Sequence, residues 1–492
     1  MYIVSIDVGT GGLHVAAYEE SGQLLASDYK EVRYSSDIMA EYLEFDPETL
    51  FQASMDLLSA TIARAGIPYK ETVILALTGQ RHGCVFLDEK MQPVLAVANL
   101  DGRVDQETLR RFEIHRDTIY KITGRLPSEI FPALRLVWLA ANQSDVFRRI
   151  HGFLMINEWF SFRLTGKPYA EKTSISESLL FDVRDASWSE QLLELFRQKD
   201  LATWPVVDPG TIVGTIQSEC AGRYSLPQGA LISLSAGDTQ CAVIGSRAFE
   251  TGDVVAVNGS TTPIVMVTDE LVFDPLQRTW ADLFIDDRYL IESNAGKTGM
   301  VYRGLTKALS CQELPEASPE MVFEARRLNI SATLVPDPAE PIDFLGSPYE
   351  IRFTADPVQV LRLLPYLMME NTAFAIVANI DEVTRVMKMG PRRVYLTGGS
   401  SRSPLTQTIV SVLLEASPLI LTSTYDTTSK GAAMLALSRV QSRLSVRDVF
   451  SSGDADNGET LYPGSVQGSF VELVRERYQQ WRERFTGMKR NG

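Results

Sequence analysis

Two short loops rich in glycine and threonine, each between two apolar runs, recur about half a chain apart and strongly constrain the fold. The first, DVGTGG at residues 7–12, separates YIVSI from VAAY, and the second, NGSTTP at residues 258–263, lies within DVVAVNGSTTPIVMVT. Apolar runs on either side of a tight loop predict two strands joined by a turn. A chain of 492 residues is also too long for one hydrophobic core. We therefore expect an α/β fold of two duplicated domains that face each other across a cleft.

The two loops have two interpretations. Glycine, threonine and aspartate form tight hairpin turns, and one such loop alone indicates no more than a turn. Glycines also let the backbone approach a polyphosphate, hydroxyl and amide groups donate hydrogen bonds to it, and a carboxylate such as that of Asp7 binds magnesium. A matching loop in each half favours a clamp on a triphosphate. The predicted phosphate contacts are Thr10, Gly11, Gly12, Gly259, Ser260, Thr261 and Thr262.

A third glycine loop lies in the second half, where RRVYLTGGSSRSPLTQTIVSVLL predicts a strand, a turn and a helix. Gly398, Gly399 and Ser400 form either an ordinary strand-to-helix turn or a third loop that faces the nucleotide. Further on, TTSKGAAMLAL at residues 427–437 predicts a helix whose small residues permit close packing of backbones.

Asp238 follows the apolar strand LISLSA, within the sequence GDTQ. An aspartate in this place commonly caps the helix that follows. Phosphoryl transfer, however, also needs a carboxylate that orients and deprotonates the attacking hydroxyl. Because this strand ends at the expected seam between the two halves, Asp238 is the candidate catalytic base.

Two polar loops in the first half are candidates for binding a polyhydroxylated ligand. GQRHG at residues 79–83 offers Gln80, Arg81 and His82 on a loop between two apolar strands. NLDGR at residues 99–103 offers Asn99, Asp101 and Arg103. The alternatives are a structural histidine in the first loop and a plain turn held by an Asp–Arg pair in the second.

Composition excludes several classes of function. A net charge of −15 disfavours nucleic acid as a partner, because neutralising its phosphates needs clustered lysine and arginine. The four cysteines form no CxxC pair, which fits a reducing cytoplasm rather than a disulfide framework. We find no N-terminal signal pattern and no apolar stretch near the length of a membrane span, so we expect neither secretion nor a membrane partner.

In the order of the chain, these motifs resemble those of the FGGY carbohydrate kinases, which belong to the actin/hexokinase-like ATPase superfamily. The resemblance covers nearly the whole length and also includes FPALRLVWL, ESNAGKTGMVYRGL and KGAAMLA. It implies two ribonuclease-H-like domains, residues 1–246 with the sugar site and first phosphate loop, and residues 247–492 with the second phosphate loop and adenosine site. It also implies ATP with Mg²⁺ in the cleft, Asp7 near the metal, Asp238 as base, and Asp238 and Thr239 at the acceptor.

The resemblance suggests a ketopentose such as xylulose as the acceptor, since GQRHG is similar to the GQMHG loop of xylulokinases, with Arg81 in place of methionine. The ANLDGR stretch, the Arg81 position and residues 150–166 are closer to autoinducer-2 kinases. Those kinases act on a linear dihydroxypentanedione and have glutamate at the position of His82. Arg135 replaces a family lysine, and residues 312–357 and 427–431 also depart from the family pattern. The open alternatives are an autoinducer-2 kinase, another polyol or sugar-acid kinase, and a catalytically silent sugar- or nucleotide-binding regulator. The oligomeric state stays open, with a homodimer as one candidate.

Overall fold

The computed structural model describes residues 1–32, 42–308, 318–342, 350–353, 356–441, 445–450, 458–464, 466 and 468–488. Cys311 and parts of the segment 312–357, for which the sequence predicts mainly loop, lie outside the described residues.

The first sheet contains the first predicted hairpin. Its strands are β1 (Tyr2–Val8), β2 (Gly12–Glu19), β3 (Leu24–Glu31), β4 (Val73–Gly79), β12 (Thr211–Thr215) and β13 (Leu231–Leu234). They lie in the order β12-β13-β4-β1-β2-β3. The strands β1, β2 and β3 are antiparallel, whereas β4 and β13 continue the sheet in parallel to β1. The turn between β1 and β2 is the predicted loop DVGTGG.

The second sheet repeats this topology. Its strands are β14 (Asp253–Val257), β15 (Pro263–Thr268), β16 (Trp280–Leu283), β17 (Tyr289–Asn294), β20 (Arg393–Thr397), β21 (Leu419–Leu421) and β22 (Thr460–Leu461). The strands β14, β15 and β17 are antiparallel, and β20 and β21 continue in parallel to β14. NGSTTP joins β14 to β15, as DVGTGG joins β1 to β2. The predicted duplication of an α/β unit is therefore confirmed.

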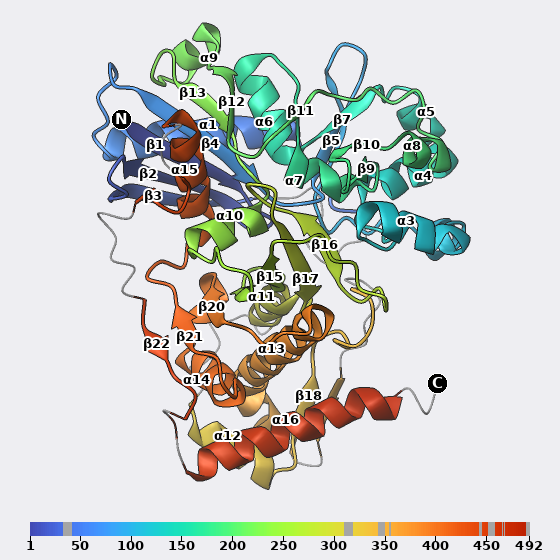
Figure 1. The fold of residues 1–492 in the computed structure, drawn as a ribbon, viewed down its shortest axis with the longest axis vertical. Coiled ribbons are helices and arrows are strands. Elements are labelled where there is room, and N and C mark those ends of the chain that lie inside the picture. Colours follow the sequence, from blue (N-terminus) through green and yellow to red (C-terminus); the bar gives the residue numbers. More distant parts are fainter. Residues whose placement is uncertain are drawn as a thin grey trace.

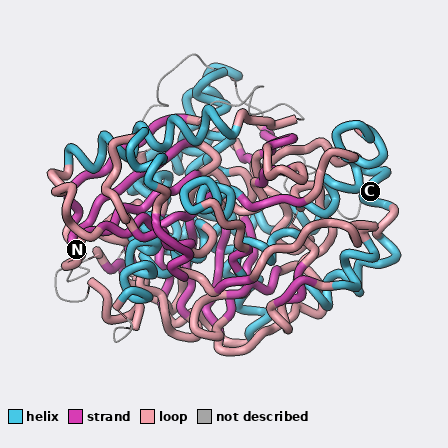
Figure 2. Tube along the Cα trace, turned by 90° about the horizontal axis from the view of Figure 1, so that it is seen from above, coloured by secondary structure: helices cyan, strands magenta, loops and turns pink. Residues whose placement is uncertain are grey.

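The helices and the two sheets form alternating layers (Figure 1). The helices α1 (Pro47–Arg64) and α6 (Ile156–Thr165) cover the outer face of the first sheet. The helices α13 (Pro357–Met387) and α14 (Pro404–Leu413) cover the outer face of the second sheet, and α16 (Ser469–Met488) packs on α14 and α12 (Glu320–Arg327). Between the sheets lie α10 (Asp238–Gly245) and α15 (Thr427–Val440), which pack on apolar side chains of both. Figure 2 shows the strands in the interior with helices around them.

The two central helices cross in close contact because glycine lies at their crossing point. A Cβ on Gly245 of α10 would overlap the carbonyl of Thr427, and a Cβ on Gly431 of α15 would overlap the carbonyl of Cys241. The predicted close packing of the helix at residues 427–437 is therefore confirmed. As a result, α15 packs on β1 and β4 of the first sheet although it lies late in the chain.

A smaller part of the first half contains β5 (Cys84–Leu87), β6 (Pro93–Val97), β7 (Gly152–Met155) and α4 (Pro132–Asn142), which enclose an aromatic core. This part places the GQRHG loop, because β4 ends at Gly79 and β5 begins at Cys84. The remaining elements of the first half are α2 (Gln106–Arg110), η1 (Glu113–His115), α3 (Arg116–Thr123), α5 (Ser144–Phe147), β8 (Ala170–Glu171), α7 (Lys172–Ile175), η2 (Ser176–Ser178), β9 (Phe181–Asp182), β10 (Ser187–Trp188), α8 (Glu190–Leu195), β11 (Val206–Val207) and α9 (Ser218–Arg223). Those of the second half are α11 (Thr298–Ala308), β18 (Ser331–Thr333), β19 (Glu350–Arg352) and η3 (Gly399–Arg402).

Among the described residues, the segment Val358–Met387 of α13 is the one helix long and apolar enough to span a membrane. The expectation that no apolar stretch is near the length of a membrane span is therefore wrong. In the structure, 78% of its most apolar window is buried inside the molecule, where the helix packs on the second sheet.

Candidate active site

A cleft of about 620 Å³ lies where the two halves meet, and all three predicted glycine loops line it. The first loop contributes Gly9–Gly12, the second Gly259–Thr261 and the third Gly398–Ser400. The predicted residues that reach the cleft are Asp7, Thr10, Gly11, Gly12, Arg81, His82, Asn99, Asp238, Thr239, Gly259, Ser260, Thr261, Gly398, Gly399 and Ser400. The duplicated hairpins thus face each other, as the sequence predicts.

Local contacts shape the first loop. Tyr29 on β3 donates a hydrogen bond from its hydroxyl to the carbonyl of Gly11 at 2.8 Å. A Cβ on Gly12 would overlap the ring of Tyr29, which explains why glycine is needed there. Asn99 donates from Nδ2 to the hydroxyl of Thr10 at 2.8 Å, so the loop is tied to the NLDGR segment.

Asp7, at the end of β1, has the most strongly shifted carboxyl in the cleft. Burial, together with the nearby carboxylates of Asp238 and Asp426, raises its pKa from 3.8 to about 8. Its Oδ1 atom is buried and has no hydrogen-bond partner. An oxygen ligand surrounded by further carboxylates fits a hard divalent cation, whose charge would restore the ionised form of Asp7.

Asp238 is the first residue of α10, and Gly237 occupies the N-cap position. Its Oδ1 accepts a hydrogen bond from the backbone N–H of Thr239 at 2.7 Å and lies 3.7 Å from Nε of Arg81. Burial raises the pKa of Asp238, and Arg81 and the Thr239 N–H partly offset that rise. The side chain is 31% exposed towards the cleft. A carboxylate that keeps an accessible oxygen beside the glycine loops has the position required of a base.

Arg81 and His82 sit in a buried cluster of charged groups. Arg81 makes two hydrogen bonds to the carboxylate of Glu292, at 2.7 and 2.9 Å, and a third to Glu177 at 3.2 Å. His82 places Nε2 2.9 Å from Glu177, and its backbone has a φ of +66°. Burial lowers the pKa of His82. Burial alone would raise the pKa of Glu177, but Arg125 and Arg81 hold it below its usual range.

Four predicted site residues lie behind the cleft wall instead of on it. Gln80 accepts from the backbone N–H of Asn99 at 2.9 Å and so positions that residue. Asp101 and Arg103 bond to each other at 2.6 Å, and neither side chain is exposed. This is the alternative of a turn held by an Asp–Arg pair. Thr262 bonds to Asn258 and Thr298. We correct these four predictions: each side chain is already engaged inside the protein.

Sequence reasoning missed several polar residues of the cleft. His14 lies opposite Asp7 in the β1–β2 register and places Nδ1 2.7 Å from the carboxylate of Asp426. Arg303 on α11 donates to the hydroxyl of Ser260 at 2.9 Å. The guanidinium of Arg402 lies over the ring of Tyr425, with 4.9 Å to its centroid. The ESNAGKTGMVYRGL motif contained Arg303, and Asp426 directly precedes TTSKGAA, so these motifs held the missed signal.

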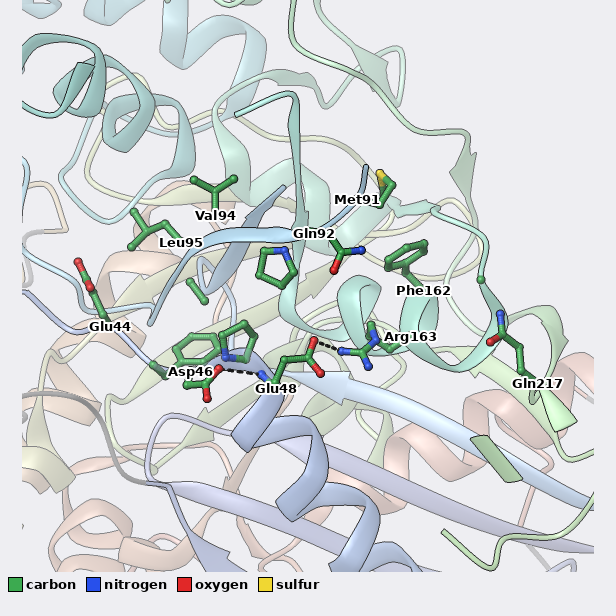
Figure 3. Close-up of a pocket in the computed structure, with 15 residues that line it drawn as sticks. Glu44, Asp46, Glu48, Met91, Gln92, Val94, Leu95, Phe162, Arg163 and Gln217 are labelled. Carbon is green, nitrogen blue, oxygen red and sulfur yellow. Dashed lines mark hydrogen bonds and ion pairs between the residues drawn. The ribbon is translucent and has the colours of Figure 1, made fainter. Parts of the chain in front are cut away.

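A second pocket, of about 670 Å³, lies elsewhere in the first half and shares no lining residue with the cleft. Figure 3 shows Glu48 at the start of α1 paired with Arg163 of α6 across it. Asp46 accepts from the backbone N–H of Glu48 and caps α1. The Glu48–Arg163 pair thus joins α1 to α6.

Comparison with known proteins identifies the family. Residues 2–245 match the N-terminal domain of the FGGY family of carbohydrate kinases. The chain belongs to this family. A putative sugar kinase, YoaC of Bacillus subtilis, is 29% identical over 450 residues, which cover 88% of this chain and 89% of that protein. The autoinducer-2 kinase of Escherichia coli K12 is 23% identical over 431 residues, covering 83% and 81%.

Solved structures of this FGGY kinase's neighbours show the same fold. Xylulose kinase from Lactobacillus acidophilus superposes with a TM-score of 0.84 at 17% identity, covering 99% of this chain and 98% of that one. Gluconate kinase from the same organism gives 0.83 at 17% identity, with the same coverage. Plasmodium falciparum glycerol kinase with ADP gives 0.78 at 20%, covering 98% of each chain. The protein is an ATP-dependent carbohydrate kinase with a small-molecule sugar substrate.

Proposed function

We propose that this FGGY kinase transfers the γ-phosphoryl group of ATP to a hydroxyl of a ketopentose such as xylulose. One observation carries the proposal: Asp238, Arg81 and His82 line the same cleft as three glycine loops. The proposed N-terminal domain, residues 1–246, supplies the acceptor side and the first phosphate loop. The proposed C-terminal domain, residues 247–492, supplies the second phosphate loop and the adenosine site. We place the enzyme in the cytoplasm, with a homodimer as the candidate assembly.

The phosphates would lie between the two hairpin loops. Thr10–Gly12 and Gly259–Thr261 line the cleft, and their backbone N–H groups and hydroxyls would donate to the phosphate oxygens. Arg303, held beside the second loop through Ser260, adds a positive charge next to Gly11. The adenosine would then lie towards Gly398–Ser400, where Arg402 and Tyr425 complete the wall. In a closed site, fixed donors of this kind stabilise the charge on the transferring group.

Asp7 would hold Mg²⁺ through its unpartnered oxygen. When bound, the ion neutralises part of the negative charge of the phosphates. Among the described residues, no group of three or more histidine, cysteine or acidic side chains is arranged to hold an ion. This fits a cation that takes one or two protein carboxylates and fills its remaining positions with phosphate oxygens and water.

Asp238 would act as the base. Its carboxylate accepts the proton of the acceptor hydroxyl as that oxygen forms a bond to the γ-phosphorus and the bond from phosphorus to ADP breaks. Arg81, 3.7 Å away, favours the ionised form of the carboxylate that can take the proton. Closure of the two halves around the substrates would exclude water, which limits wasteful hydrolysis of ATP.

Release of ADP in a coupled assay tests the function. The panel contains xylulose and other ketopentoses, polyols, and a reaction without acceptor. We expect turnover that depends on acceptor and is highest with a ketopentose. A catalytically silent regulator would bind sugar or nucleotide but release no ADP with any acceptor, and that result would refute the proposal.

Autoinducer-2 kinase is the second candidate function. The observation in its favour is the 23% identity to such a kinase over 83% of this chain. Dihydroxypentanedione therefore belongs in the same panel. If kcat/KM for dihydroxypentanedione exceeds that for every ketopentose, dihydroxypentanedione replaces the ketopentose as the proposed acceptor. The proposed roles of Asp238 and the glycine loops would be unchanged.

A further inference from the structure

The acceptor side of the cleft contains an arginine whose charge is already neutralised. An arginine beside a sugar site is well suited to bind a carboxylate, because its planar fork matches the two oxygens. Xylulose kinase and gluconate kinase from Lactobacillus acidophilus have the same fold at the same 17% identity to this chain. The fold therefore does not decide between a neutral and an acidic acceptor. The surroundings of Arg81 bear on that choice.

Arg81 has carboxylates on several sides. Glu292 of β17 holds the outer fork through two hydrogen bonds, and its side chain is 0% exposed. Glu177 accepts from Nη1, and the carboxylate of Asp238 lies 3.7 Å from Nε. A substrate carboxylate would have to displace Glu292 and leave it buried without its partner, which is strongly unfavourable. It would also bring a further negative charge beside Asp238, with the repulsion between like charges that this entails.

Uncharged hydroxyls meet a different environment in the same place. The Oδ1 atom of Asn99 is buried and has no hydrogen-bond partner, so it is ready to accept from a hydroxyl. The hydroxyl-bearing Thr239 and the apolar side chains of Leu100 and Ile130 also line this part of the cleft. The arrangement suits a polyol or ketose. None of these residues carries a positive charge that could pair with the carboxylate of a sugar acid.

We propose that Glu292 determines specificity by occupying Arg81, so that the enzyme accepts neutral polyols and ketoses and rejects sugar acids. The inference rests on the proposed function only in that Arg81 lines the acceptor site. Glu292 touches no substrate in this scheme and acts through Arg81.

The test compares kcat/KM for matched pairs of acceptors, xylitol with xylonate and glucitol with gluconate, alongside xylulose. We expect the unmodified enzyme to prefer the neutral member of each pair by at least about 100-fold, because a carboxylate would lie next to like charge. Comparable kcat/KM for a pair would overturn the proposal, and this measurement needs no variant.

The variant Glu292→Gln keeps the shape of the side chain and one hydrogen-bond acceptor for Arg81 but removes the charge. It should lower the neutral-to-acid ratio at least about tenfold, because the carboxylate that holds the outer fork of the guanidinium no longer carries a charge. The control is Asp286→Asn, which also removes one carboxylate charge but at a half-exposed side chain paired with Arg439 and absent from the lining of the cleft. It should leave the ratio unchanged.

A folded Glu292→Gln enzyme with the parent ratio would overturn the role of Glu292. Thermal melting confirms that each variant is folded. The outcomes also separate this inference from the proposed acceptor. If the enzyme phosphorylates a neutral polyol but no ketopentose, the proposed acceptor is wrong, but the exclusion of sugar acids is still supported.

Discussion

The carboxyl of Asp238 is held between two opposing influences. Burial raises its pKa, and Arg81 and the Thr239 N–H lower it. Since the net shift is upward, the fraction of ionised base declines as the pH falls through a value above 3.8. Turnover should therefore decrease in mild acid at a higher pH than a surface aspartate would dictate. Arg81, beside the base, limits how far the pH of this decline in turnover shifts upward.

We predict that Asp238→Asn keeps its fold and loses activity. The asparagine oxygen can still accept from the Thr239 N–H, so the start of α10 should persist. It cannot take a proton, and a positioned base contributes about 10²–10⁴ in rate. We expect a melting temperature near that of the parent, normal binding of ATP, and turnover lower by at least about 100-fold. Near-normal turnover would leave Asp238 as a structural residue of the helix start.

We predict that His82→Asn weakens binding of the acceptor and not of ATP. Asparagine is chosen because position 82 has a φ of +66°, which asparagine tolerates better than most residues. An unmade hydrogen bond in a buried site costs about 1–3 kcal/mol, or about 5- to 150-fold in KM for the acceptor. Steady-state kinetics with each substrate varied in turn measures both KM values. Equal changes in the two would indicate a general disturbance of the cleft.

We predict that Asp7→Asn stabilises the ligand-free protein while abolishing turnover. The folded protein holds a proton on Asp7 up to about pH 8, whereas the unfolded chain releases it near 3.8. The parent therefore loses stability relative to the variant as the pH rises between these two values, and no further loss follows above pH 8. Melting temperatures from pH 5 to 9, measured in EDTA, should show a gap that widens and then levels off. A gap independent of pH would contradict the buried, protonated state.

At the scale of elements, the crossing of α10 and α15 depends on Gly245 and Gly431. We predict that Gly431→Ala destabilises the protein by about 3 kcal/mol or more, since its Cβ would overlap the carbonyl of Cys241 and backbone cannot easily yield. The matched control is Gly222→Ala in α9, where nothing lies within 4 Å of the added Cβ. This control should be neutral or more stable by up to about 1 kcal/mol, because alanine favours helix. Urea unfolding of both variants provides the comparison.

At the scale of the whole molecule, the features that can be predicted from the sequence are those set by short local motifs. Glycines of DVGTGG and NGSTTP mark hairpins that recur, and their pairing is enough to predict a duplicated fold with loops facing a cleft. Asp101 and Arg103 show the limit of such prediction, because an aspartate and an arginine in a turn can either bind a sugar or pair with each other. Arg81 shows it more sharply. Its partner Glu292 lies 211 residues away, and nothing near position 81 indicates that the charge is neutralised. The sequence division at residue 246 likewise assigns α15 to the second half, although it packs on the first sheet.

That placement of α15 has a consequence for how the chain is made. Ile3 and Ile74 belong to the same buried cluster as Ala432 and Leu435 of α15. On the ribosome, β1 and β4 are complete once Gly79 has been added, but α15 is complete only at Val440. At about 5–20 residues per second, roughly 20–70 s of synthesis separate the two events. Throughout that interval, part of one face of the first sheet is without its helix, so the nascent chain presents apolar surface that chaperones bind. Premature termination between β13 and residue 427 would make that exposure permanent, and the truncated product should aggregate even though every strand of its first sheet is present.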